Sequence, residues 1–146
     1  MAIEALAVID EMIARWNSKD EEAFAEVFVE DADFTDVLGQ TAHGRAEIAA
    51  LHTFPFTRTL RKATLTADHV AARTCGTDTL VVRVHWSMSG PLAIDDSTLP
   101  DLQGKMQVVL QRGAEGWKIV SLLNQNPAGV YGKQLPHGSG FKSAAV

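Results

Sequence analysis

The sequence predicts an α+β fold in which about three helices come first and a curved antiparallel β-sheet then wraps around them. Apolar residues recur at spacings of three and four in the N-terminal third of the chain, which is the helical period. From residue 61 onward, apolar and polar residues alternate, which is the period of a half-buried strand. We therefore expect one cone-shaped domain over residues 1–128, followed by a glycine-rich tail over residues 129–146.

Two helices are predicted before residue 30. The first covers residues 2–17, and its buried stripe is formed by Ile3, Leu6, Ile9, Ile13 and Trp16. Ser18 and Glu21 have the spacing of a capping box, which predicts that Ser18 is the N-cap of the second helix. The inward face of the second helix is expected to carry Ala23, Phe24, Val27 and Phe28.

A third, short helix is predicted over residues 45–52. Ile48, Leu51 and His52 are three and four residues apart, so they share one helix face, which we expect to meet the core. Pro55 is expected to end this helix, because the residue before a proline is disfavoured in the α region.

The segment between the second and third helices contains an acid in an apolar setting. Read as a strand over residues 32–38, the segment places four residues on one face: Ala32, Phe34, Asp36 and Leu38. Burying a carboxylate without a partner is costly, so Asp36 on that face needs a function or a bonding partner. We therefore expect a small hydrophobic pocket with Asp36 in its wall. A turn at Gly39 and a short return strand over residues 40–43 are expected to follow.

Four more strands are predicted over residues 61–70, over 79–88, from Met106 onward and over 117–125, the last two pairing as a hairpin. Strand 79–88 carries Leu80, Val82, Val84, Trp86 and Met88 on one face. Its other face carries Val81, Arg83, His85 and Ser87, for which we expect solvent or dimer contact. Residues 89–104 are expected to form a loop long enough to act as a lid or a contact arm.

Composition and charge exclude several classes of function. The net charge of −5 disfavours nucleic acid as a partner, and no apolar run is long enough to span a membrane. Glu4 stands where a signal peptide would carry basic residues, so we expect a cytoplasmic protein. The single cysteine, Cys75, allows no internal disulfide. No metal-ligand spacing and no glycine fingerprint for nucleotides is present, so no cofactor and no metal are expected.

The order of several short motifs resembles the NTF2-like superfamily. These motifs are Trp16-Asn17-x-x-Asp20, Ala23-Phe24 to Phe28, Asp31-Ala32-Asp33-Phe34, Gly39, Gly44-Arg45-x-x-Ile48, His52, Trp86, Trp117-Lys118-Ile119 and Asn124. They are similar to the SnoaL-like, SgcJ/EcaC-type branch over about residues 3 to 126. The resemblance implies a cone-shaped fold with an internal pocket, which is commonly a homodimer through the sheet. Proteins of this branch are encoded in enediyne antibiotic gene clusters, which implies a polyene or aromatic polyketide ligand.

The same superfamily includes ketosteroid isomerases, and part of their catalytic set can be carried over. Asp36 matches their general-base aspartate, which also has a glycine three residues later. Met12 stands where their oxyanion tyrosine would lie, and Gln107 or Val108 stands where their second oxyanion donor, an aspartic acid, would lie. Because a methionine cannot donate a hydrogen bond, the resemblance implies a site without that oxyanion hole, and ketosteroid isomerase activity is not expected.

The candidate site therefore combines two groups of residues. Asp36 and His52 are the candidate catalytic pair, with His52 as the proton partner of Asp36; a carboxylate and a core histidine that are simply hydrogen-bonded are the structural alternatives. The candidate ligand-pocket residues are Met12, Trp16, Phe34, Leu38, Trp86 and Asn124. Tryptophans in such positions are more often core residues than a platform for a ligand, although both could line the mouth of the cone. The strand face of Asn124 is ambiguous from the sequence.

Three hypotheses of function follow. The first is an enzyme of polyketide tailoring in which Asp36 removes a proton next to a carbonyl or activates water. The second is a cofactor-free protein that binds a small apolar or aromatic molecule in the same pocket, and the missing oxyanion donors favour it. The third is a dimerisation module whose pocket is plugged by side chains. In all three, the expected partner protein is a second copy of this chain that pairs through the sheet.

Overall fold

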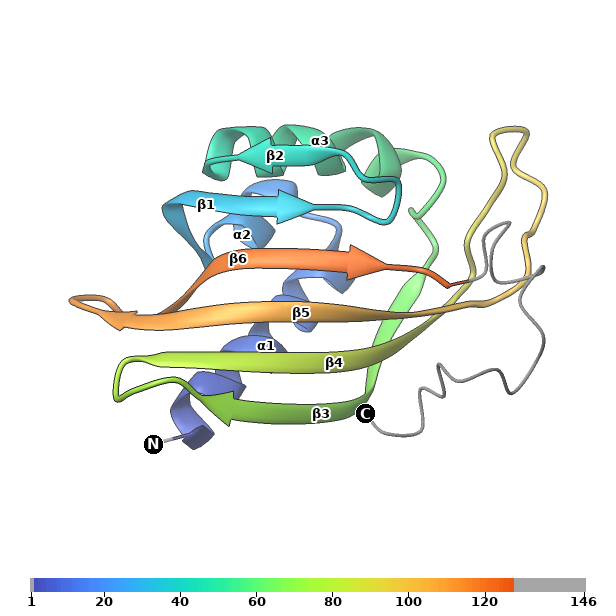
Figure 1. The fold of residues 1–146 in the computed structure, drawn as a ribbon. Coiled ribbons are helices and arrows are strands. Elements are labelled where there is room, and N and C mark those ends of the chain that lie inside the picture. The colour runs from blue at the N-terminus through green and yellow to red at the C-terminus, as the bar shows by residue number, and fades with distance from the viewer. Residues whose placement is uncertain (1, 128–146) are drawn as a thin grey trace.

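The computed structural model describes residues 2–127 and confirms the α+β fold. Its elements are α1 (Ala2–Ser18), α2 (Glu21–Ala25), β1 (Phe28–Thr35), β2 (Thr41–His43), α3 (Arg45–Thr57), β3 (Thr64–Thr74), β4 (Thr79–Ser89), β5 (Leu102–Gly113) and β6 (Gly116–Gln125). The six strands form one curved sheet in the order β2-β1-β6-β5-β4-β3, and the helices cover one of its faces (Figure 1). The expected tail at 129–146 lies outside the described residues. Within residues 2–127, no helix is long and apolar enough to cross a membrane.

One strand pairing differs from the expected antiparallel sheet. β1 and β6 run parallel, with Phe34 opposite Leu122 and Thr35 opposite Leu123, whereas the other four pairings are antiparallel. Parallel neighbours need a long connection, and β2, α3 and the three strands β3 to β5 supply it between β1 and β6. The two parallel strands therefore both end at the same edge of the sheet.

The hydrophobic core lies between the helices and the inner face of the sheet. The alternation predicted for residues 79–88 is confirmed, because Leu80, Val82, Val84, Trp86 and Met88 are all buried. The stripe predicted for α1 is confirmed at Ile9 and Trp16, but Leu6 and Ile13 are only half-buried and Ile3 is 81% exposed. The helix is rotated so that its fully buried face is formed by Ala5, Ile9, Met12 and Trp16. The apolar stripe of the helix and the apolar face of the strand, each with its own period, thus form one core.

The second helix begins later than the capping box predicts. Asp20, not Ser18, is the N-cap, and its carboxylate accepts the backbone N–H of Ala23 at 3.1 Å. Lys19 has a positive φ of 63°, which turns the chain after α1, so Ser18 still belongs to the first helix. The helix is only five residues long, and Phe28, expected on its inward face, is instead the first buried residue of β1.

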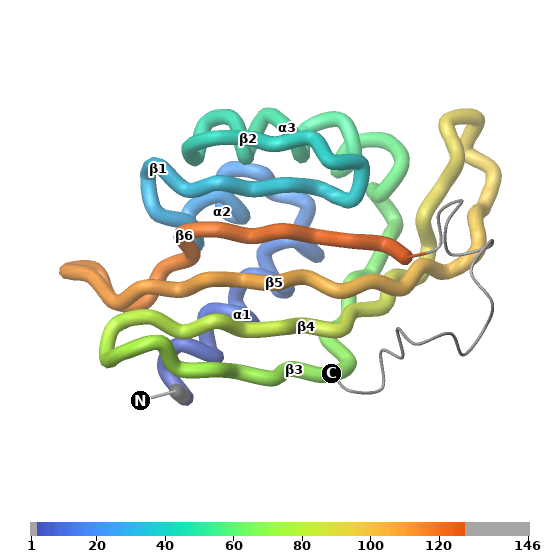
Figure 2. The backbone as a smooth tube through the Cα atoms, in the orientation of Figure 1, coloured from blue at the N-terminus to red at the C-terminus, as the bar shows by residue number. Residues whose placement is uncertain are grey.

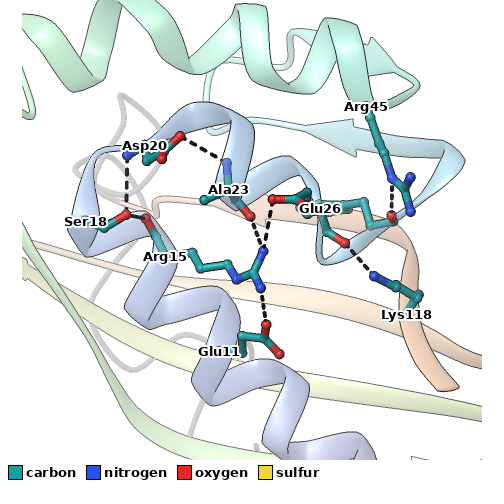
Figure 3. A network of polar contacts seen from close by, with 9 residues as sticks. Glu11, Arg15, Ser18, Asp20, Ala23, Glu26, Arg45 and Lys118 are labelled. Atoms are coloured by element: carbon teal, nitrogen blue, oxygen red, sulfur yellow. Dashed lines mark hydrogen bonds and ion pairs between the residues drawn. The ribbon is translucent and has the colours of Figure 1, made fainter. Parts of the chain in front are cut away.

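Basic side chains from three elements satisfy the carbonyl groups at the end of α2 and the start of β1 (Figure 3). Arg15 of α1 donates to the carbonyl oxygen of Ala23 at 2.7 Å, and Lys118 of β6 donates to that of Glu26 at 2.7 Å. Arg45 donates to the first carbonyl of β1 at 2.8 Å. Carbonyl groups at a helix end lack partners within the helix, so these bonds fix the short helix against its neighbours.

The sequence predicts that the third helix ends at Pro55. In the structure the helix instead continues through Pro55 to Thr57. Pro55 removes one backbone donor from the helix. The extra turn buries Phe56, whose ring meets those of Trp16 and Phe24 edge-on at centroid distances of 5.5 and 6.2 Å. Burial of this aromatic side chain offsets the missing bond, because large rings contribute strongly to core packing.

The loop between β4 and β5, shorter than predicted because β5 begins at Leu102, lies beside the end of α3 (Figure 2). The backbone N–H of Leu92 donates to the carbonyl of Thr59 at 2.8 Å, and Arg61 forms an ion pair with Asp96 at 3.0 Å. The loop is thus bonded to the turn that follows α3, at the same edge of the sheet where β1 and β6 end.

Candidate functional site

A cavity of about 260 Å³ opens between the inner face of the sheet and the helices. All eight candidate residues line it: Met12, Trp16, Phe34, Asp36, Leu38, His52, Trp86 and Asn124. Sequence reasoning missed several further wall residues, among them Phe24, Leu60, Leu65, Leu102, Met106 and Leu122. The strand alternation predicts that most of these side chains point inward. It does not predict that they meet in one cavity wall, because that depends on how the strands pair. The cavity is open in this structure rather than plugged, unlike the pocket that the dimerisation-module hypothesis predicts.

Asp36 lies in a turn and not in the strand that the sequence predicts over residues 32–38. β1 ends at Thr35, and Oδ1 of Asp36 accepts the backbone N–H groups of Leu38 and Gln40, both at 2.9 Å. A side chain that captures nearby backbone donors competes with the strand and ends it. The alternation holds up to Phe34, which is buried, but Leu38 is 79% exposed and stands at the cavity mouth.

The turn fixes the carboxylate of Asp36 in the cavity wall. Oδ1 is used by the two backbone donors, whereas no bond to Oδ2 is present among the described residues. The half-buried side chain of Asp36 therefore stabilises the turn through Oδ1. Its Oδ2 remains as an acceptor for a ligand.

His52 stands in a cage of phenylalanine rings. It is 7% exposed, and its ring centroid lies 4.6 Å from that of Phe24, 4.9 Å from Phe34 and 5.2 Å from Phe56. The rings come from α2, β1 and α3, so the histidine connects the helices with the sheet at the cavity wall.

The bonding of His52 determines its tautomer. Nδ1 lies 2.8 Å from the carbonyl oxygen of Ile48, which can only accept, so Nδ1 carries the proton and Nε2 is the acceptor. Burial lowers the pKa of His52, and the bond to Ile48 and the charge of Asp36 only partly oppose this effect. The ring is therefore neutral at pH 7.

The candidate pair of Asp36 and His52 is not a hydrogen-bonded dyad among the described residues. Nδ1 of His52 is bonded to a backbone carbonyl, and Oδ1 of Asp36 is bonded to backbone amides. The two side chains face the same cavity and interact through charge alone. Any proton transfer between them would have to pass through a ligand or water in the cavity.

Trp86 and Asn124 are joined across an intervening strand. The indole Nε1 of Trp86 on β4 donates to Oδ1 of Asn124 on β6 at 2.8 Å, although β5 lies between these strands. Gly104 of β5 stands opposite Trp86, and a Cβ atom there would overlap the indole ring and the carbonyl oxygen of Gln125. A glycine inside a strand indicates such a close approach, which is the one signal by which the sequence could have revealed this contact.

Lys19 contacts Trp16, one of the residues that line the cavity. Its Nζ donates to the carbonyl of Ala63 at 2.6 Å and lies 3.8 Å from the centroid of the Trp16 ring. Burial of the amine lowers the pKa of Lys19 to about 8. The cation over the ring face fixes the position of Trp16, whose ring also lines the cavity.

The positions that match the oxyanion donors of the isomerases contain no hydrogen-bond donor that reaches the cavity. Met12 lines the wall through an apolar side chain, and Val108 is completely buried. Gln107 pairs with Arg83 on the outer face of the sheet. The polar residues that line the cavity are instead Asp36, His52, Thr59, Asn124 and Asn126.

Solved structures of several proteins share this fold. A domain of unknown function from Nostoc punctiforme PCC 73102, with a cystatin-like fold, is 28% identical, with a TM-score of 0.74 over 91% of this chain and 80% of that one. An NTF2-like protein from Novosphingobium aromaticivorans is 27% identical, with a TM-score of 0.71 over 91% and 88% of the two chains. A ketosteroid isomerase-like protein from Erwinia carotovora atroseptica is 15% identical, with a TM-score of 0.73 over 87% and 96%, which shows a common fold alone. None of the curated proteins matches the sequence.

The match to a family of sequences covers most of the domain. The model of the SnoaL-like domain matches residues 9–120, from the middle of α1 into β6. This span contains most of the residues that line the cavity, and the neighbouring folds are of the same NTF2-like type. The chain therefore belongs to the SnoaL-like domain family.

Proposed function

We propose that this chain is a small-molecule pocket protein of natural-product biosynthesis that binds an apolar polyene or aromatic ligand in the cavity without a cofactor. The observation that carries the proposal is the cavity itself, which is walled mainly by apolar and aromatic side chains and has only a few polar groups. Such a wall, with few and fixed polar groups, is typical of small-molecule sites.

The size of the cavity limits the ligand. A cavity of about 150 Å³ is enough for benzene, so about 260 Å³ accommodates a bicyclic ring system. A longer polyene or a larger polyketide would extend through the mouth, where Val37 and Leu38 are 43% and 79% exposed. Apolar side chains at an opening favour a ligand that is itself apolar where it leaves the protein.

The finer assignment, to the SgcJ/EcaC-type branch of enediyne clusters, is part of this proposal. The motifs around Trp16 and Trp86 support it, as does membership of the SnoaL-like domain family. Binding without catalysis is supported by Met12 and Val108, because neither can stabilise an oxyanion.

A second candidate function is that of a cyclase or isomerase with Asp36 as general base. The observation that favours it is a pair of acceptors in the wall, Oδ2 of Asp36 and Nε2 of the neutral His52, to which no described residue donates. In this case Asp36 would take the proton from a carbon next to a carbonyl, and His52 would accept or return a proton through the ligand.

One experiment separates the two functions. Wild type, Asp36→Asn and the control Asp33→Asn, which changes an exposed acid of β1 just before the turn, are incubated with a panel of polyenes and aromatic polyketides. Tryptophan quenching measures binding, and mass spectrometry measures any chemical change. The binding function predicts a ligand that is bound by wild type and recovered unchanged. A ligand converted by wild type and by Asp33→Asn, but not by Asp36→Asn, would establish the enzyme. Absence of binding to wild type would refute both functions.

A homodimer through the outer face of the sheet is a further part of the proposal. Leu123 lies on that face opposite Gln107 and is 56% exposed, which supports an apolar contact between copies. Sedimentation of wild type as a dimer and of Leu123→Glu as a monomer would support it, and a monomeric wild type would contradict it.

A further inference from the structure

Two polar side chains stand at the same level on neighbouring strands. β1 and β6 are parallel, with Thr35 opposite Leu123, so the next residues along the chain, Asp36 and Asn124, are neighbours across the pair. Both line the cavity. A ligand that meets one of these side chains is therefore within reach of the other.

The amide of Asn124 is held in one orientation. An indole N–H can only donate, so the atom of Asn124 that it contacts at 2.8 Å must be the oxygen. This bond resolves the ambiguity between the oxygen and nitrogen of an amide side chain. The backbone N–H of Gln125 also donates to this oxygen, at 2.9 Å. The Nδ2 group, with its two N–H donors, is the part of the side chain that these bonds leave for the cavity.

The carboxylate of Asp36 is a hydrogen-bond acceptor, whereas the Nδ2 group of Asn124 is a donor. Its Oδ1 is bonded to the two backbone donors of the turn, which leaves Oδ2 as an acceptor. Nε2 of His52 is a second acceptor in the same wall, because Nδ1 carries the proton. The cavity thus presents a donor beside an acceptor on a mainly apolar wall.

We infer that the ligand of this cavity is a hydroxyketone, whose carbonyl oxygen accepts from Nδ2 of Asn124 and whose neighbouring hydroxyl donates to Oδ2 of Asp36. This inference rests on the proposed function and specifies the ligand class. A diketone would direct its oxygen lone pairs at the carboxylate of Asp36. A diol would fit only if its second O–H donated to Nε2 of His52, the other acceptor in the wall.

Two isosteric substitutions isolate the two bonds. Asn124→Asp keeps an oxygen for the indole of Trp86 but removes the Nδ2 donors. Asp36→Asn keeps an oxygen for the turn but replaces the second acceptor by a donor. Gln125→Glu is the matched control, because it makes the same amide-to-acid change on the next residue of β6, which is exposed and pairs with Lys105.

Calorimetric titration with four bicyclic ligands tests the inference: tetralin, 1-tetralone, 2-tetralol and 2-hydroxy-1-tetralone. In wild type and Gln125→Glu, each oxygen group is expected to tighten binding severalfold, up to about tenfold, so the hydroxyketone binds most tightly. Asn124→Asp should lose the gain from the carbonyl and keep that from the hydroxyl. Asp36→Asn should show the reverse. The indole N–H signals in NMR spectra check that the contact of Trp86 survives in each variant.

The outcomes separate the hydroxyketone inference from the proposed function of ligand binding. If wild type binds tetralin but gains nothing from the carbonyl, or if Asn124→Asp keeps the wild-type order of affinities, the hydroxyketone inference is wrong while the apolar pocket stands. If none of the four ligands binds to wild type, both the inference and the proposed function fail.

Discussion

Two tryptophans of the sheet pack into the core near its opposite ends, and among the described residues only one has a hydrogen-bond partner for its indole N–H. Trp86 lies at the cavity and donates its N–H to Asn124, whereas Trp117 follows the β5–β6 hairpin. The Nε1 of Trp117 is buried without a partner in the part of the chain that the structure describes. The fold therefore tolerates a buried indole N–H that is not hydrogen-bonded. The bond between Trp86 and Asn124 is thus a feature of the cavity end of the sheet and has no counterpart at Trp117 among the described residues.

Two glycines of β5 also differ between the cavity end and the hairpin end of the sheet, and their substitution should give the largest expected change in stability. Gly104→Ala should lower the free energy of unfolding by about 3 kcal/mol, because the new methyl group overlaps the Trp86 ring and neighbouring backbone. Gly113→Ala, at the hairpin end of the same strand, meets no atom within 4 Å and should change stability by less than about 0.5 kcal/mol. Urea denaturation measures both. Equal effects of the two substitutions would contradict the close crossing of Trp86 over β5.

Substitution of the tryptophans themselves should give a smaller difference. Trp86→Phe removes a hydrogen bond and leaves space at a site that is 3% exposed, and it should cost about 2 kcal/mol. Trp117→Phe removes an N–H that has no partner and should be close to neutral. Chemical denaturation followed by circular dichroism compares them. The account is contradicted if Trp117→Phe is the more destabilising change.

His52 gives a pH dependence with a defined sign. Burial lowers its pKa in the folded state, so the unfolded chain binds the proton more readily. The stability that depends on neutral His52 is present above about pH 6.5 and is lost as the pH falls through the folded pKa, with a slope of at most about 1.4 kcal/mol per pH unit. His52→Gln should flatten this decline. It should not abolish it, because burial also lowers the pKa of His85. An unchanged decline in His52→Gln would contradict the assignment.

His43, on the outer face, should behave in the opposite way and with the smallest effect. Its Nδ1 lies 2.6 Å from Oδ1 of Asp33, and this hydrogen bond and charge raise the pKa of His43. The pair therefore stabilises the folded state below about pH 6.5, and this contribution is lost as the pH rises through the folded pKa. NMR titration should place the midpoint of His43 above 6.5 in wild type and lower in Asp33→Asn. No difference between the two would show that the pair does not form in solution.

Much of the fold could be predicted because it depends on local periodicity. The alternation of β4 is a property of one short segment and is confirmed. The stripe of α1 is confirmed only in part, because Ile9 and Trp16 are buried but Ile3 is 81% exposed. The extension of α3 beyond Pro55 could not be predicted in this way. It depends on Phe56 meeting rings from two other helices, and local propensity contains no information about them.

The candidate site was predictable in its residues but not in its geometry. Asp36 and His52 were found because polar side chains were expected on apolar faces, and both line the cavity. The turn at Asp36 was missed, because its carboxylate captures backbone donors and ends the strand early. The contact between Trp86 and Asn124 was missed as well, since it joins strands that are not neighbours and needs the register of the whole sheet.

The most direct test of the central claim is calorimetric titration of 1-tetralone into wild type and two leucine variants. Leu102→Trp fills the cavity wall, and Leu123→Trp makes the same change on the outer face of the sheet. The account predicts one ligand per chain for wild type and for Leu123→Trp, and loss of binding for Leu102→Trp. Binding to Leu102→Trp with the wild-type affinity would show that the ligand does not occupy the cavity, and would contradict the account.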